Sequence, residues 1–131
     1  MKNLSLTFCL TITALLSGGL ATALHANTYQ LTCIVDDSKF TTNYLIDENA
    51  KTIFQINSFN PPTEQVWTVN EYLKIIDWRN DRLVLTVSIS ELDEMPIIHF
   101  FNLKTKKLYL AGFYKNRKPH SDSRTCFSSM N

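Results

Sequence analysis

The stretch RLVLTVSISE, from Arg82 to Glu91, decides the fold class of this chain. Apolar residues recur at every second position, a period typical of a β-strand that buries one face. We expect the buried face to carry Leu83, Leu85, Val87 and Ile89, and the outward face to carry Arg82, Val84, Thr86, Ser88 and Ser90. On this expectation Val87→Asp should unfold the domain, whereas Ser88→Ala should be nearly silent.

Such a strand needs partners, and short alternating segments supply them roughly every ten residues, the spacing of β-sandwiches and barrels. The segments are 28–35, 40–46, 52–58, 66–69, 72–78, 97–103, 107–114 and 125–127, of which 72–78 could instead begin with a helical turn. The first three follow one another too closely for parallel crossovers, which predicts an antiparallel meander. The sequence therefore predicts an all-β domain, a small antiparallel β-barrel or β-sandwich of about eight strands.

Turn residues suggest how the later strands pair. Arg79-Asn80-Asp81 joins 72–78 to 82–91 as a hairpin, and the turn KTKK joins 97–103 to 107–114 as another. Asn60-Pro61-Pro62 interrupts the sheet, because proline cannot donate to a strand ladder. The strand 82–91 thus gains a partner on each side, which predicts a central position in the sheet.

The first 26 residues read as a secretory signal peptide. Lys2 is followed by an apolar run and by a small-residue region that ends ATALHA, so cleavage fits after Ala23 or after Ala26. An uncleaved membrane anchor is the alternative, but threonines, serines and a Gly18-Gly19 pair weaken it. We expect a periplasmic or secreted protein with one domain over 27–131, which is not an integral membrane protein after cleavage.

Two cysteines remain after the signal, Cys33 and Cys126. Thiols in a small exported domain usually pair, so we expect a disulfide that ties the first strand to the C-terminal segment. The loop that it closes covers most of the domain, and the chain-entropy model assigns such a bond a stabilisation of up to about 4.7 kcal/mol.

Several classes of enzyme lack their signatures here. Gly112 is the only glycine after the signal, so no nucleophile elbow, phosphate loop or dinucleotide fingerprint is present. No zinc motif occurs either, and we expect no cofactor and no metal. His99 paired with Asp77 or Glu91 would be the remaining catalytic arrangement, and His120 with Asp122 a weak metal contact, but a packed histidine and a solvated tail explain both.

The acidic clusters are also explained by turns and solubility. Asp36-Asp37, Asp47-Glu48 and the group Glu91, Asp93 and Glu94 could bind calcium or act on a glycan, but short acidic side chains are common in turns.

The charge is divided along the chain although the net charge is only +1. Acidic residues dominate up to Glu94, and basic residues dominate from Met95 onward. The functional interpretation is attraction to an anionic cell-envelope component or an acidic protein, and the alternative is a solvated turn and tail. Near-neutral charge and export argue against nucleic acid. The candidate basic residues form two groups at opposite ends of the strand 107–114, namely Lys104, Lys106 and Lys107, and Lys115, Arg117 and Lys118.

Aromatic residues around the Pro61-Pro62 loop are the other candidates for partner contact. Phe59, Trp67 and Tyr72 surround this loop, where an aromatic side chain can anchor a partner. In size, export and strand content the chain resembles the small periplasmic barrels that inhibit lysozymes, although their inhibitory loop pattern is not present.

These observations favour an exported, non-enzymatic binding module for a protein or envelope partner, of the inhibitor or immunity type. A barrel that carries a small apolar ligand is the alternative, and a periplasmic hydrolase ranks third.

Overall fold

The computed structural model describes residues 27–89, 96–113 and 118–129. The predicted signal peptide lies outside these residues, as do Glu91, Asp93, Glu94, Lys115 and Arg117. Within the described ranges, no helix is both long and apolar enough to span a bilayer.

The described chain is all-β, as the alternating sequence pattern predicts. Apart from one turn of 3-10 helix at Pro61–Thr63, it consists of nine strands. They are β1 (Thr28–Val35), β2 (Thr41–Asp47), β3 (Thr52–Asn60), β4 (Gln65–Tyr72), β5 (Lys74–Trp78), β6 (Leu83–Ile89), β7 (Pro96–Asn102), β8 (Lys107–Gly112) and β9 (His120–Ser129).

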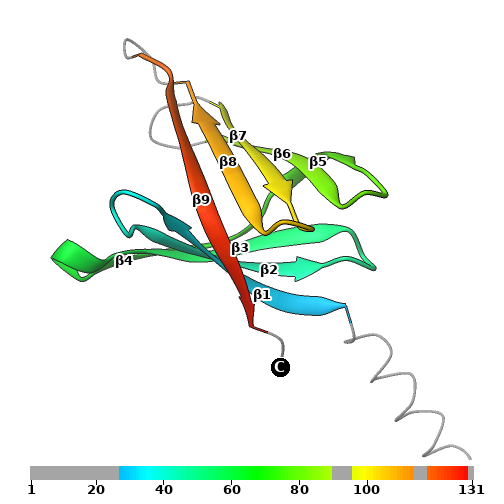
Figure 1. Cartoon of the computed structure of the whole chain (residues 1–131), viewed down its shortest axis with the longest axis horizontal. Coiled ribbons are helices and arrows are strands. Elements are labelled where there is room, and N and C mark those ends of the chain that lie inside the picture. The colour runs from blue at the N-terminus through cyan, green and yellow to red at the C-terminus, as the bar shows by residue number, and fades with distance from the viewer. Residues whose placement is uncertain (1–26, 90–95, 114–117, 130–131) are drawn as a thin grey trace, which may run out of the picture.

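All nine strands belong to one antiparallel sheet that curls into a half-barrel (Figure 1). The strand order is β4-β3-β2-β1-β9-β8-β7-β6-β5, which confirms the initial meander and both predicted hairpins. Strand β6 has a partner on each side, as expected, but it lies next to an edge, and β9 occupies the middle of the sheet.

The C-terminal strand is much longer than expected. A short strand over 125–127 was predicted, yet β9 has ten residues, because it pairs with β8 through His120–Thr125 and with β1 through Arg124–Ser129. The first half of this strand is polar, so the hydropathy pattern does not indicate a strand there. Strand β9 therefore joins the two halves of the sheet, and the predicted Cys33–Cys126 disulfide crosses the β1–β9 junction.

The core lies between the two halves of the folded sheet. The Tyr44 ring of β2 meets the Phe101 ring of β7 edge to face, with centroids 5.1 Å apart, and both side chains are fully buried. Such aromatic pairs stabilise a core beyond the area that they bury. The other buried hydrophobic residues are Leu31, Cys33, Ile46, Ile53, Leu73, Val84, Leu103, Leu108 and Cys126.

The predicted buried face of β6 is wrong. Val84 and Thr86 have no exposed surface, whereas Leu83, Leu85 and Val87 are half-buried and Ile89 is 67% exposed. The inner face is set by β7, since Val84 lies opposite Phe101 and Thr86 opposite His99. The outer side chains of β6 are partly covered by apolar neighbours on β7, such as Phe100 beside Leu85. Alternation identifies a strand, but where both faces carry apolar residues it does not say which face points inward.

Because glycine is scarce, other residues adopt the left-handed backbone conformation in the turns. Among the described residues, six other than glycine have positive φ: Lys39, Lys51, Glu64, Asn70, Arg82 and Lys106. This left-handed conformation normally favours glycine or asparagine. Lysine and arginine thus take positions at the hairpin turns where most proteins use glycine.

Candidate functional site

Two adjoining cavities open at the end of the half-barrel where the β1–β2 turn meets the start of β9. Their volumes are about 660 and 350 Å³, and they share four lining residues, Phe40, His120, Asp122 and Arg124. We call the two cavities together the open-end cleft. The smaller cavity extends inward to Tyr44 and His99, so the cleft leads from the surface turn to the aromatic core.

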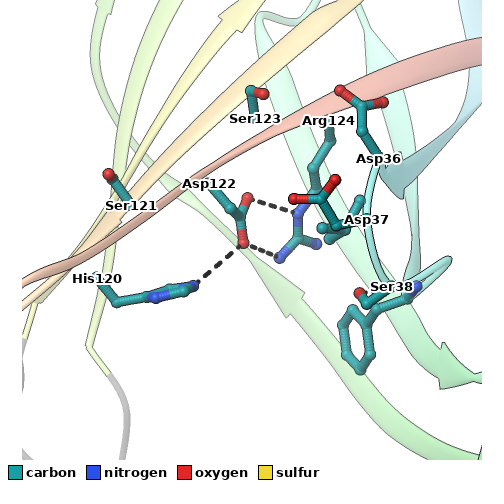
Figure 2. Close-up of a pocket in the computed structure, with 10 residues that line it drawn as sticks. Asp36, Asp37, Ser38, His120, Ser121, Asp122, Ser123 and Arg124 are labelled. Carbon is teal, nitrogen blue, oxygen red and sulfur yellow. Dashed lines mark hydrogen bonds and ion pairs between the residues drawn. The ribbon is translucent and has the colours of Figure 1, made fainter.

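Arg124 occupies the centre of this cleft (Figure 2). Its Nε and Nη2 donate to the two carboxylate oxygens of Asp122 at 3.0 and 3.2 Å, and its Nη1 donates to Thr42 Oγ1 at 2.8 Å. Its guanidinium also lies 5.5 Å from the centroid of the Phe40 ring. These contacts come from β9, β2 and the β1–β2 turn, which together hold the cation in place. Only 8% of the residue is exposed.

The arrangement leaves Arg124 with capacity for a further contact. A guanidinium has five N–H donors, and the described hydrogen bonds use three of them. A buried ion pair contributes little net stability compared with apolar residues of similar size, because desolvation offsets the attraction. The stability of the sheet therefore does not by itself explain this ion pair.

His120 and Asp122, which the sequence suggests as a weak metal contact, lie side by side on β9. His120 Nε2 is 3.7 Å from Asp122 Oδ2, and Arg124 already occupies both oxygens of that carboxylate. Asp36 and Asp37 lie across the cleft from His120 (Figure 2). Within the described ranges, no group of three metal-ligating side chains comes together.

His99 lies at the inner end of the cleft and is almost fully buried. Its ring stacks on Phe101 at a centroid distance of 6.0 Å, and its Nδ1 atom has no hydrogen-bond partner in the described chain. Burial, with the nearby charge of Arg124, lowers the pKa of His99 to about 4, so the ring is neutral at pH 7. Asp77 cannot serve it as a catalytic partner, because Asp77 pairs with Leu85 on the outer face of the sheet.

The lowered pKa of His99 should make stability depend on pH. The unfolded histidine takes up a proton near pH 6.5, whereas the folded one resists until about pH 4. The free energy of unfolding should therefore fall as the pH drops below 6.5, by about 2 kcal/mol at pH 5. Urea unfolding at pH 7 and pH 5 measures this loss. His99→Gln should remove most of it, and His120→Gln, which changes an exposed histidine, should not; an unchanged loss in His99→Gln would contradict the assignment.

The predicted aromatic candidates do not gather at one point. Trp67 of β4 lies toward the cleft, where its ring contacts Phe40 at a centroid distance of 5.7 Å. Tyr72 is 69% exposed and packs edge to face on Phe54, 4.9 Å away, on the outer face. Phe59 pairs with Val66 on that same outer face and is half-buried. Of the three, only Trp67 belongs to the surface that adjoins the open-end cleft.

The basic candidates are also spread out. Lys104 and Lys106 are exposed in the β7–β8 turn, and Lys118 is exposed near the opposite end of β8, just before β9. Lys107 differs from both, because its Nζ donates to Thr125 Oγ1 at 2.7 Å. The expectation of two separate groups is consistent with this placement, although Lys115 and Arg117 fall outside the described residues.

Sequence reasoning missed Arg124, the buried and hydrogen-bonded cation of the cleft. The signal was the spacing of Asp122, Arg124 and Cys126, which places all three on one face of a strand. The polar segment 115–123 has no apolar alternation, so its composition alone predicts a solvated tail.

Comparison of the chain with protein-family models, with curated proteins and with solved structures finds no match.

Proposed function

We propose that this protein is an exported, non-enzymatic binding protein that recognises an extended segment of a protein partner. The segment would pair with edge strand β4 and place a side chain in the open-end cleft. The observation that carries the proposal is the exposure of β4: seven of its eight residues are exposed. Strand β4 is also hydrogen-bonded to a single neighbour, β3.

An edge strand offers a row of unpaired N–H and C=O groups, and proteins that must avoid pairing protect such edges with lysine, proline or bulges. The sequence of β4, QVWTVNEY, contains no lysine, arginine or proline. The opposite edge, β5, is shorter and carries the charged residues Lys74 and Asp77, whereas β4 carries only Glu71; both edges have one register shift against their neighbour. The two edges therefore differ, and β4 is the one suited to strand addition.

The cleft provides side-chain specificity beside this edge. Trp67 on β4 contacts Phe40, and Phe40 contacts Arg124, so the edge strand and the cleft form one continuous surface. A partner strand on β4 would present alternate side chains toward the cleft, because successive side chains point to opposite faces. Arg124 and Asp122 would then distinguish partners by the charge of the inserted group.

Export is part of the same proposal. The disulfide supports an oxidising compartment, which agrees with the predicted signal peptide. We therefore place the protein in the periplasm or outside the cell.

A matched pair of lysine substitutions tests strand addition. Val66 on β4 and Phe127 on β9 are each 57% exposed on the outer face of the sheet. A photo-crosslinker at Thr68 should recover a partner from the envelope or secreted fraction of the source organism. In Val66→Lys the amount of recovered partner should fall at least tenfold. It should be retained in Phe127→Lys, because an edge charge blocks pairing only at its own edge. Equal recovery in both variants, or repeated recovery of no partner, would contradict the proposal.

Carriage of a small apolar ligand is a second candidate, favoured by the inner cavity. That cavity of about 350 Å³ lies at the lower end of the range for small-molecule sites, and Tyr44, Val69, Ile97 and Leu110 contribute apolar lining. Leu110→Trp should fill it. If the protein is a carrier, this change abolishes binding of the apolar fluorophore N-phenyl-1-naphthylamine; if strand addition is its function, partner crosslinking survives the change.

A further inference from the structure

A further cavity, smaller than the two of the open-end cleft, lies at the opposite end of the half-barrel. It has a volume of about 270 Å³ and is lined by Tyr29, Leu31, Arg82, Leu103, Lys104, Lys106 and Ser128. Its position is set by two turns, the β5–β6 turn and the β7–β8 turn, which are joined by a hydrogen bond from Leu103 N to Arg82 O at 3.0 Å. We call this cavity the basic pocket.

The basic pocket combines an apolar floor with a cationic rim. Leu31 and Leu103 are only 2% and 3% exposed and belong to the core. Above them stand the charges of Arg82, Lys104 and Lys106. The three cations are exposed, so they stay hydrated at the rim of the pocket.

The charges around this pocket do not cancel. Glu48 forms an ion pair with Arg82 and accepts a hydrogen bond from the Tyr29 hydroxyl at 2.7 Å. Burial and the adjacent Glu48 carboxylate raise the pKa of Tyr29 to about 12, so this phenol stays neutral. Lys104 and Lys106 form no ion pair with any described residue. Two unmatched positive charges therefore remain beside an apolar floor.

From this juxtaposition we propose that the basic pocket binds the anionic headgroup of an amphiphile, with the first part of its apolar chain on Leu31 and Leu103. Lys104 and Lys106 neutralise the anion, and the Ser128 hydroxyl, which lines the pocket, can donate a hydrogen bond to it. The proposal is independent of strand addition at β4, because the basic pocket and the open-end cleft share no lining residue.

Calorimetric titration with decanoate, below its micelle concentration, tests this site in the disulfide-bonded protein. We expect decanoate to bind at least tenfold more tightly than decyltrimethylammonium, which has the same chain and the opposite charge. Acetate should bind much more weakly, since each buried methylene tightens binding about fourfold. Equal binding of the anion and the cation would overturn the proposal.

Charge-matched double variants locate the site. Lys104→Gln with Lys106→Gln should weaken decanoate binding at least tenfold. Lys51→Gln with Lys74→Gln removes the same net charge from exposed positions outside the pocket and should change it less than twofold. All four side chains are exposed, so neither double variant should alter folding, and a thermal melt checks this. Equal losses in the two double variants would show a general charge effect and overturn the site.

Cosedimentation with phosphatidylglycerol vesicles separates the two sources of such a headgroup. Vesicle binding that decanoate displaces identifies a membrane lipid, and decanoate binding without vesicle binding identifies a free amphiphile. Both outcomes support the basic pocket. Vesicle binding by a protein that does not bind decanoate would overturn it.

Discussion

Val84→Asp should unfold the domain. Val84 has no exposed surface, and it lies opposite Phe101 in the β6–β7 ladder, beside the aromatic core. An aspartate there would bury an unpaired charge and remove apolar contacts, a combination that costs more than about 4 kcal/mol. Because small domains have a total stability of about 5–15 kcal/mol, most of the folded population should be lost. Urea unfolding followed by tryptophan fluorescence measures this effect.

Val87→Asp is the matched control on the same strand. Val87 is half-buried on the outer face, so an aspartate there keeps access to water, and the midpoint of unfolding should shift only slightly. This reverses the expectation from the alternating pattern alone. A larger loss of stability in Val87→Asp than in Val84→Asp would show that the outer face is the buried one.

Removal of the disulfide should have the other large effect. Cys33 and Cys126 are 93 residues apart in sequence and lie directly opposite each other on β1 and β9. The bond restricts the unfolded chain over nearly the whole domain, and the chain-entropy model assigns about 4.7 kcal/mol to a loop of this length. Cys33→Ala with Cys126→Ala should therefore lower the free energy of unfolding by several kcal/mol.

Thermal unfolding with and without a reductant provides the control for the cysteine variant. The reductant should destabilise the original protein and leave the double variant unchanged. The double variant should also match the reduced protein, because both lack the same constraint. A double variant as stable as the oxidised protein would show that the β1–β9 junction holds without the bond.

Local patterns in the sequence were sufficient for most of the strands. The hairpins around Arg79-Asn80-Asp81 and around KTKK form as predicted, because short connections between alternating segments leave antiparallel pairing as the simple solution. The pairing of Cys33 with Cys126 followed from their number and from the predicted export. The hairpins depend on residues that are close in sequence, and two cysteines allow only one disulfide pairing.

The candidate site was only partly visible from the sequence. Trp67 was predicted as a contact residue and adjoins the cleft, and Lys104 and Lys106 line the basic pocket. Arg124 was not predicted, and its main contacts show why: Thr42 lies 82 positions away in the sequence, and Phe40 belongs to the β1–β2 turn. No local sequence pattern predicts a contact between strands that become neighbours only in the folded sheet.

By itself the sequence determined that this chain forms an antiparallel β domain with one disulfide, because a two-residue period and short turns restrict the backbone locally. The tertiary structure alone decided which face of RLVLTVSISE is buried. Alternation is symmetric between the two faces of a strand, and the choice depended on Phe101 and Tyr44 meeting across the curled sheet. It also decided that polar β9 lies at the centre, because only pairing with β1 and β8 on both sides makes that segment a strand.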